Sequence, residues 1–304
     1  MSMICSIQAP IDATAFHDRI YAGEILCFRQ LPAMLRLVEA TRQFCTEALH
    51  PTVPGAVHEL TPLTRQVDRL RELRRDYARD RHMKGLWLEL FESVGLATAR
   101  AARDRLILRF QTHHSDEAGR SRDTATAPLA FHRDTWGSNL YAQVNWWAPV
   151  YPLSEGRTMA VYPSLFNRCL SNTSSAFNVR EVVERNRQSG HQRADADAVI
   201  PQLSEVLDPS LAHPVIIEPG DIIALSGAHC HGSIPNRSGV SRISLETRTI
   251  WIDDVIAGRG APNVDGKAPW MAPGWFRRMS DGKRLSDILG TDPLCPYPGT
   301  KRNV

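Results

Sequence analysis

The 304-residue chain has no run of 18 or more apolar residues, and its first residues lack the charged-then-apolar order of a secretory signal. These absences argue against a transmembrane helix and against export. We therefore expect a cytoplasmic protein with no membrane partner. The six cysteines include no C-x-x-C pair, which argues against a zinc knuckle or a disulfide framework and favours reduced, structural thiols.

The common catalytic signatures are missing as well. The chain has no G-x-S-x-G elbow, no Walker-type loop, no G-x-G-x-x-G after a strand and no H-E-x-x-H, so nothing supports a hydrolase, kinase or dehydrogenase. Only four of the 36 basic residues are lysines. The arginine bias suits a pocket for carboxylates, or reflects codon composition alone. The formal net charge is only +3, and the basic stretch 69–81 is interleaved with acidic residues, so no nucleic-acid partner is expected.

The first third of the chain carries helical periodicity. An apolar run over 24–31 precedes Pro32, after which apolar residues recur at helical spacing, and this predicts a strand followed by an amphipathic helix. A second helix is predicted to open at Thr61 and Pro62. We expect Gly85 to break it before a further helical segment over 86–96.

From residue 105 the hydrophobic period changes to two. Six short runs bounded by turn residues predict strands, at 105–111, 140–150, 157–163, 213–219, 221–227 and 242–251. The pattern predicts a mainly β fold with flanking helices, a double-stranded β-helix or jelly roll.

We expect one domain over 1–304 with three parts. The first is a mostly helical part (1–104), the second a jelly-roll core (105–251), and the third an irregular extension (252–304) that wraps the surface. The polar interval 165–212, with a helix over 178–188, interrupts the core as an insertion. Such an insertion is either a lid over a site or a solvated excursion.

The motif FHRDTW, at 131–136, is the strongest chemical signal. In an extended strand His132 and Asp134 point to the same side, so an imidazole and a carboxylate could hold one face of a metal ion while Arg133 points away. About 100 residues later the tripeptide HCH places His229 and His231 on one side of an extended segment, and either could be a third ligand. Two histidines and one carboxylate are typical of non-heme Fe(II) sites with three open positions.

Four features occur in the order found in one enzyme family. They are the H-x-D of His132 and Asp134, the segment 153–166, the segment 219–227 leading to His231, and Arg242 eleven positions beyond it. Over residues 105–250 the chain resembles the Fe(II)/2-oxoglutarate oxygenases, specifically the phytanoyl-CoA hydroxylase-like branch. The resemblance selects His231 as the ligand and leaves His229 as a histidine beside the site or at the surface. Residue 230, a cysteine, is expected to pack as a small apolar side chain.

The resemblance implies Fe(II), 2-oxoglutarate and O2 as cofactor and cosubstrates. Arg242 would bind the distal carboxylate of 2-oxoglutarate, because a guanidinium forks onto a carboxylate. Ser233 and Ser244 are further candidates for binding the cosubstrate. Asp134 is the carboxylate that halogenating relatives replace by a small residue, so its presence favours hydroxylation, with 2-oxoglutarate converted to succinate and CO2. Desaturation, cyclisation and epimerisation stay open because they differ only in substrate pose.

Strand parity suggests further pocket residues. Gln143 and Asn145 share one strand face and could bind the cosubstrate, or could satisfy buried backbone groups. Other residues are candidate substrate contacts, for which core packing or a solvated face is about as good an explanation as a role in binding. These candidates are Trp136, Arg109, Gln111, Trp147 and Arg248. The polar segment 112–128 is a candidate rim loop, with surface histidines at 113 and 114.

We therefore predict an Fe(II)- and 2-oxoglutarate-dependent dioxygenase that hydroxylates an unactivated C–H bond. The expected substrate is a small-molecule metabolite or natural-product intermediate of specialised metabolism. The alternative from another class is a noncatalytic jelly-roll protein that binds or senses a small molecule. Arg242 argues against this alternative, since a sensor needs no anchor for 2-oxoglutarate.

Overall fold

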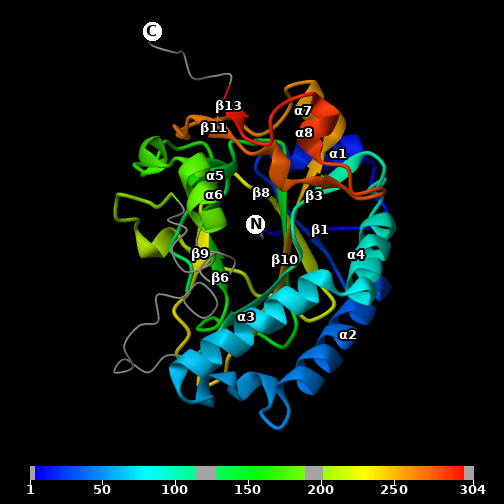
Figure 1. Ribbon diagram of the computed structural model, residues 1–304, viewed down its shortest axis with the longest axis vertical. Helices are drawn as coiled ribbons and strands as arrows, with labels where there is room; N and C mark the ends of the chain where they lie inside the picture. The colour runs from blue at the N-terminus through cyan, green and yellow to red at the C-terminus, as the bar shows by residue number, and fades with distance from the viewer. Residues whose placement is uncertain (1–3, 114–127, 189–200, 298–304) are drawn as a thin grey trace.

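A computed structural model describes residues 4–113, 128–188 and 201–297, and its main feature is an eight-stranded sheet (Figure 1). The strands follow the order β1-β2-β8-β5-β10-β3-β12, and β4 also pairs with β10. Their bounds are β1 (Ile4–Ile7), β2 (Ile25–Phe28), β3 (Ala101–Arg103), β4 (Ile107–Gln111), β5 (Gln143–Pro149), β8 (Ile222–Ser226), β10 (Arg242–Trp251) and β12 (Arg277–Arg278).

A smaller sheet faces this one. It has three strands in the order β7-β6-β9, with bounds β7 (His213–Pro214), β6 (Met159–Val161) and β9 (His231–Ser233). A buried apolar cluster joins side chains of both sheets, among them Trp147 of β5, Met159 of β6 and Leu225 of β8. A separate two-stranded sheet pairs β11 (Trp270–Met271) with β13 (Cys295–Pro296). The chain is therefore sheet-rich, with an apolar contact between its two larger sheets.

Strand β10 is central to the large sheet, and its alternating side chains determine which face of the sheet carries the site. It pairs with β5 along one edge, while β4 and then β3 pair with successive parts of its other edge. Successive side chains of a strand point to opposite faces. Ile243 and Leu245 accordingly belong to the main apolar core, whereas Arg242, Glu246 and Arg248 line a cavity on the opposite face.

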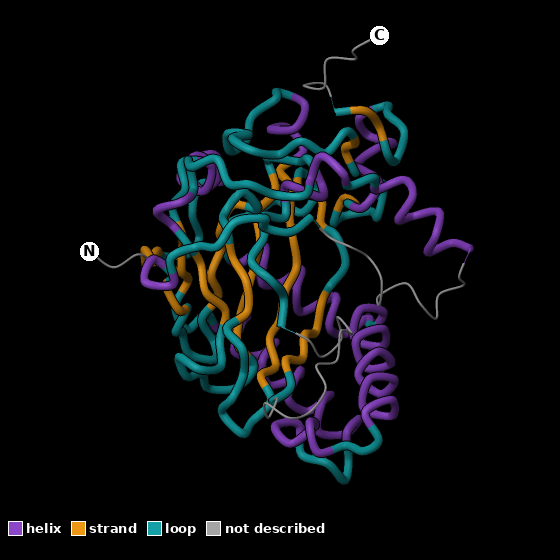
Figure 2. Tube along the Cα trace, turned by 90° about the vertical axis from the view of Figure 1, so that its left-hand side faces the viewer, coloured by secondary structure: helices purple, strands orange, loops and turns teal. Residues whose placement is uncertain are grey.

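Helices cover the face of the large sheet that is remote from this cavity, and the long helices lie to one side of the strands (Figure 2). The helices of the described residues are α1 (Ala13–Tyr21), α2 (Pro32–Leu49), α3 (Leu63–Arg79), α4 (Arg81–Ser93), α5 (Thr135–Ser138), α6 (Val179–Gln188), α7 (Ile252–Ile256) and α8 (Leu285–Leu289). Of these, α5 and α6 lie outside that layer, because their buried residues belong to separate apolar clusters. Short 3₁₀ turns are η1 (Pro54–Glu59), η2 (Pro163–Leu165), η3 (Ser174–Ala176), η4 (Pro209–Leu211) and η5 (Pro273–Trp275). None of the helices in the described ranges is long and apolar enough to cross a membrane.

The break between α3 and α4 is not where the sequence predicted it. Gly85 lies inside α4, and the chain turns instead at Asp80, whose carboxylate caps α4 by accepting a 2.8 Å hydrogen bond from the amide of Met83. An N-cap carboxylate satisfies an amide that has no partner within the helix, so it starts a new helix effectively. The prediction at Gly85 was wrong because one glycine costs a helix only about 1 kcal/mol.

The C-terminal extension also differs from its prediction. Instead of only wrapping the surface, it adds strand β12 to β3 at the edge of the large sheet, and Phe276 and Leu285 are buried in the main core. Of the strand predicted over 213–219, only His213–Pro214 pairs as a strand. The helix predicted over 178–188 is confirmed as α6. Most of the predicted rim loop, 114–127, lies outside the described residues.

Candidate metal centre

The segment that carries His132 and Asp134 is not the extended strand that the sequence suggested. His132 forms a single β-bridge with His231, whereas Asp134 has helical angles (φ −63°, ψ −30°) and precedes the short helix α5. The i, i+2 argument was therefore wrong about the backbone. The two side chains still converge, because the bridge places His132 opposite His231 and the turn into α5 brings Asp134 back toward both.

The bridge between the two histidines fixes their separation. The amide of His132 donates to the carbonyl of His231, and the amide of His231 donates to the carbonyl of His132, both at 3.0 Å. The imidazole centroids are 4.7 Å apart. Gly232 makes this approach possible, since a Cβ there would lie 2.8 Å from Cδ1 and 3.0 Å from Cα of Phe131. The centre thus depends on a glycine that lets the 131–132 segment lie against β9.

Backbone carbonyls orient both imidazoles. Nδ1 of His132 lies 2.8 Å from the carbonyl oxygen of Ala130, and Nδ1 of His231 lies 3.0 Å from that of His229. A carbonyl only accepts, so each Nδ1 carries the proton and each Nε2 presents its lone pair. The Nε2 atoms of His132 and His231 lie 3.8 and 3.7 Å from the two carboxylate oxygens of Asp134.

The three side chains form a compact donor set. One nitrogen or oxygen atom from each of His132, Asp134 and His231 lies within 4.8 Å of the others. Burial opposes ionisation of Asp134, but Arg248 and the two histidines hold its pKa well below the ordinary value. Burial lowers the pKa of His231 to about 4. An ionised carboxylate and a neutral imidazole are the protonation states that metal binding requires, so this donor set fits a divalent ion such as Fe(II).

Asp134 is itself held by two side chains. Its Oδ1 accepts a 2.8 Å hydrogen bond from Nη2 of Arg248, and its Oδ2 accepts one from Nδ2 of Asn145. Asn145 in turn accepts a 2.9 Å hydrogen bond from Nε2 of Gln143. Asn145 and Gln143, candidates for binding the cosubstrate, thus connect to the Asp134 carboxylate, and of the two only Asn145 lines the cavity. Arg248 was a candidate anchor for an acidic substrate, but two of its nitrogens bind Asp134 and Asp104.

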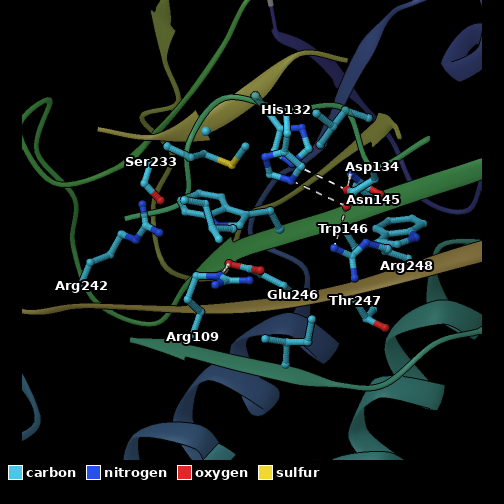
Figure 3. Close-up of a pocket in the computed structure, with 17 residues that line it drawn as sticks. Arg109, His132, Asp134, Asn145, Trp146, Ser233, Arg242, Glu246, Thr247 and Arg248 are labelled. Atoms are coloured by element: carbon cyan, nitrogen blue, oxygen red, sulfur yellow. Dashed lines mark hydrogen bonds and ion pairs between the residues drawn. The ribbon is translucent and has the colours of Figure 1, made fainter. Parts of the chain in front are cut away.

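The other end of the same cavity holds a buried cation. Figure 3 shows Arg242 and Ser233 on one side of the pocket, with His132 and Asp134 further along it. Arg242 is only 3% exposed, and its Nε and Nη1 have no hydrogen-bond partner among the described residues. Burial lowers the pKa of Arg242 to about 10, so it is a cation at neutral pH. Buried donors without partners are unusual and indicate a site for an acceptor.

Between these ends lies an ion pair. Nε of Arg109 lies 2.6 Å from Oε1 of Glu246, and both side chains line the cavity. Burial opposes ionisation of Glu246, but Arg109 lowers the pKa of this carboxyl below its ordinary value. Arg109 was predicted to face the cavity, which agrees with its position, but its charge is already compensated. Arg242 is therefore the better placed of the two arginines for an incoming anion.

Several other predicted residues do not line the cavity formed by the described residues. Ser244 is fully buried and donates to Glu246 at 3.3 Å, and Gln111 donates to the carbonyl of Ile234 at 2.6 Å. Trp136 is buried and donates from Nε1 to Asp265 at 2.7 Å. Trp147 and Ser233, by contrast, do line the cavity.

His229 is neither a ligand in this arrangement nor a surface residue. It is fully buried, with Nδ1 and Nε2 lying 3.3 and 3.1 Å from the carbonyl oxygens of Ser226 and Gly23, and its ring packs on Phe166. Cys230 is buried in an apolar cluster, as expected. The HCH segment turns before β9 begins at His231, so the two histidines face different surroundings.

Sequence reasoning missed three acidic residues, namely Asp104, Glu246 and Asp265. Each forms an ion pair with an arginine that is far away in the sequence. Pairing between strands brings Asp104 and Glu246 to their arginines, and the C-terminal part of the chain returns to bring Asp265 to Arg133. Glu246 could have been found, because it shares its parity on β10 with Arg242 and Arg248. No pattern in the sequence indicates Asp104 or Asp265.

Comparison with solved structures gives distant matches. No protein-family model and no curated protein sequence matches the chain. EvdO2 from Micromonospora carbonacea var. aurantiaca, solved with 2-oxoglutarate, is similar at 13% identity, with 81% of this chain and 93% of that chain covered and a TM-score of 0.44. The non-heme α-ketoglutarate-dependent carbocyclase SnoK, from nogalamycin biosynthesis, is similar at 14% identity, with 84% and 96% covered and a TM-score of 0.38. The assignment of function depends on the geometry of the site.

Proposed function

We propose that this chain is a non-heme Fe(II)- and 2-oxoglutarate-dependent dioxygenase. One observation carries the proposal: one cavity has a two-histidine, one-carboxylate donor set at one end and, at the other, a buried arginine whose Nε and Nη1 have no hydrogen-bond partner in the described part of the chain (Figure 3). The donor set leaves room for further ligands on Fe(II), and a guanidinium is the preferred partner of a carboxylate. A dicarboxylate with a 2-oxo group matches both ends of such a cavity.

In this proposal His132, Asp134 and His231 hold the iron, and Arg242 binds the distal carboxylate of 2-oxoglutarate with Ser233 beside it. When bound, iron, 2-oxoglutarate and O2 supply the oxidant for a C–H bond, with succinate and CO2 as coproducts. Apolar side chains in the cavity wall lower the local polarity and so strengthen the charge pairing inside; they include Trp147, Met159 and Leu225.

We further propose that the reaction is hydroxylation of a small-molecule metabolite or natural-product intermediate. Support comes from Asp134, which occupies with a carboxylate the position that a halide would need in a halogenating enzyme. We also propose that the two larger sheets form a double-stranded β-helix and that residues 105–251 are its core. The insertion 165–212 and the flanking parts belong, in this proposal, to the same oxygenase domain.

The proposal is tested by anaerobic reconstitution. Wild-type protein is titrated with Fe(II) and then 2-oxoglutarate, binding is followed by calorimetry and by the metal-to-ligand charge-transfer band, and succinate is measured after O2 is admitted. Asp134→Ala should abolish iron binding and succinate formation. Arg278→Gln, on an exposed ion pair, is the matched control and should behave as wild type.

Arg242 provides the second arm. Arg242→Met should weaken 2-oxoglutarate binding by about 30-fold with little change in iron binding, because a charge-assisted hydrogen bond is worth about 2 kcal/mol. Arg242→Lys should bind 2-oxoglutarate with an affinity between those of wild type and Arg242→Met, because lysine keeps the positive charge and loses the two-pronged guanidinium contact. If wild-type protein binds iron but no 2-oxoglutarate, the oxygenase proposal is wrong. If it binds both and forms no succinate with any substrate in a panel, a noncatalytic binding protein is the better description.

A further inference from the structure

Behind the cavity wall lies the carboxylate of Asp104, which is connected to the Asp134 carboxylate through Arg248. Nη2 of Arg248 donates to Oδ1 of Asp134 at 2.8 Å, and Nη1 donates to Oδ2 of Asp104 at 2.9 Å. One guanidinium thus bridges two carboxylates from distant parts of the chain. The side chains of Asp104 and Asp134 are each only 11% exposed, whereas that of Arg248 is 27% exposed.

Asp104 occupies its place because the sheet edge is interrupted there. It follows β3 and precedes β4, the two strands that pair with successive parts of β10, and its amide donates to the carbonyl of Arg248 at 3.1 Å. Its Oδ1 accepts hydrogen bonds from the amide of Arg248 at 3.0 Å and from the hydroxyl of Thr247 at 3.2 Å. Three donors from two neighbouring residues therefore immobilise the Asp104 carboxylate.

We propose that Asp104 and Arg248 form a clamp that fixes the orientation of the Asp134 carboxylate for metal binding, an inference that rests on the proposed metal centre. Arg248 is a positioning residue in this scheme, and Asp104 anchors it. A carboxylate on a free side chain rotates about its Cβ–Cγ bond, which has a broad torsional preference. With Oδ1 held by Arg248 and Oδ2 by Asn145, the plane of the Asp134 carboxylate is set before the ion arrives.

The alternative is that Arg248 acts only through its charge, and the two roles predict opposite signs. At a pH where the Asp134 carboxylate is ionised with or without Arg248, a cation beside a divalent ion repels it, so by charge alone the removal of Arg248 would tighten metal binding. If Arg248 orients the ligand, its removal loosens metal binding, because partners that orient metal ligands typically contribute about 10- to 100-fold in affinity. The direction of the change in metal affinity therefore separates the two roles.

The test measures Co(II) and Ni(II) binding to the purified full chain by competition with a chromophoric chelator, without substrate or turnover. Arg248→Met should weaken binding by at least about tenfold. Arg248→Lys keeps the charge and cannot bridge two carboxylates, so it should also bind more weakly than wild type. Asp104→Asn should give a smaller loss, since its remaining oxygen can still accept from the amide of Arg248 while the contact with Nη1 is lost.

A spectroscopic measurement accompanies the affinities. The Co(II) ligand-field bands should change in energy and intensity in Arg248→Met and Arg248→Lys, because the carboxylate adopts a different mode of binding, and circular dichroism should show that these variants are folded. Tighter binding by Arg248→Met, or wild-type binding and spectrum in Arg248→Lys, would overturn the clamp. Failure of wild-type protein to bind Co(II), or retention of binding in Asp134→Ala, would instead overturn the proposed metal centre.

Discussion

Arg133 stands in the sequence between His132 and Asp134, and removal of its guanidinium should destabilise the whole fold. Arg133 is only 1% exposed, and its Nε lies 3.1 Å from a carboxylate oxygen of Asp265 in the C-terminal part of the chain. Its two terminal nitrogens donate to four main-chain carbonyls, those of Leu165, Phe166, Arg168 and Ala228. One side chain thus joins the metal motif, the start of the insertion, the turn before β9 and the tail.

The expected magnitude follows from these contacts. Arg133→Met fills a similar volume but leaves the buried Asp265 carboxylate without its cation and four carbonyls without donors. Breaking a buried pair from one side costs about 4 kcal/mol. For a chain of this length the unfolding entropy is about 0.6 kcal/mol per degree, so Tm should fall by about 6 °C.

Differential scanning calorimetry on the metal-free protein at pH 7.5 measures this shift. Asp265→Asn should also lower Tm, because it leaves Arg133 as an uncompensated buried cation. Arg100→Gln removes an ion pair whose side chains are 59% and 48% exposed, and it should leave Tm within experimental error. A fall of less than about 2 °C in Arg133→Met, at unchanged unfolding enthalpy, would refute the role assigned to this residue.

Three further predictions concern other parts of the chain. Burial lowers the pKa of His17 below its ordinary value of 6.5, so on acidification the unfolded chain takes up a proton before the folded chain does, and the folded state loses stability as the pH falls below that value. His17→Gln should therefore show a smaller fall in Tm than wild type between pH 7.5 and 5.5. Parallel curves of Tm against pH for the two proteins would contradict this. Iodoacetamide should label the exposed Cys5 and Cys169 quickly, as followed by peptide mass mapping. The buried Cys27, Cys45 and Cys230 should react slowly, because burial raises the pKa of each thiol to about 12. Equal labelling rates at the exposed and buried thiols would contradict the burial. Gly232→Ala should push Phe131 away and weaken Ni(II) binding. A Ni(II) affinity equal to that of wild type would show that segment 131–132 can move without disturbing the metal ligands.

The parts of the fold that were predictable from sequence are those with local causes. The helix from Pro32 and the strand over 242–251 were found because periodicity and end signals lie within a few residues of each other. The helix break was misplaced because the capping contact of Asp80 is stronger than the propensity of Gly85. Local patterns thus located elements well and their boundaries less well.

At the site, residue types were predictable and their partners were not. The H-x-D motif indicated His132 and Asp134, and the family resemblance selected His231 over His229; the structure brings these three residues together, although the backbone conformation assumed for the first two was wrong. Arg248 was assigned to substrate because strand parity shows which face a residue occupies but not what it meets there. Its partner Asp104 is brought near by the gap between β3 and β4, which no short-range pattern encodes.

The alternation along β10 restricts where this protein can change its length. Arg242, Glu246 and Arg248 share one face of that strand, and six residues at about 3.4 Å each separate the first from the last by about 20 Å. Insertion or deletion of one residue between them would turn Arg248 to the helix side of the sheet and move it away from Asp134. The length of β10 is therefore fixed by the spacing of its own charges.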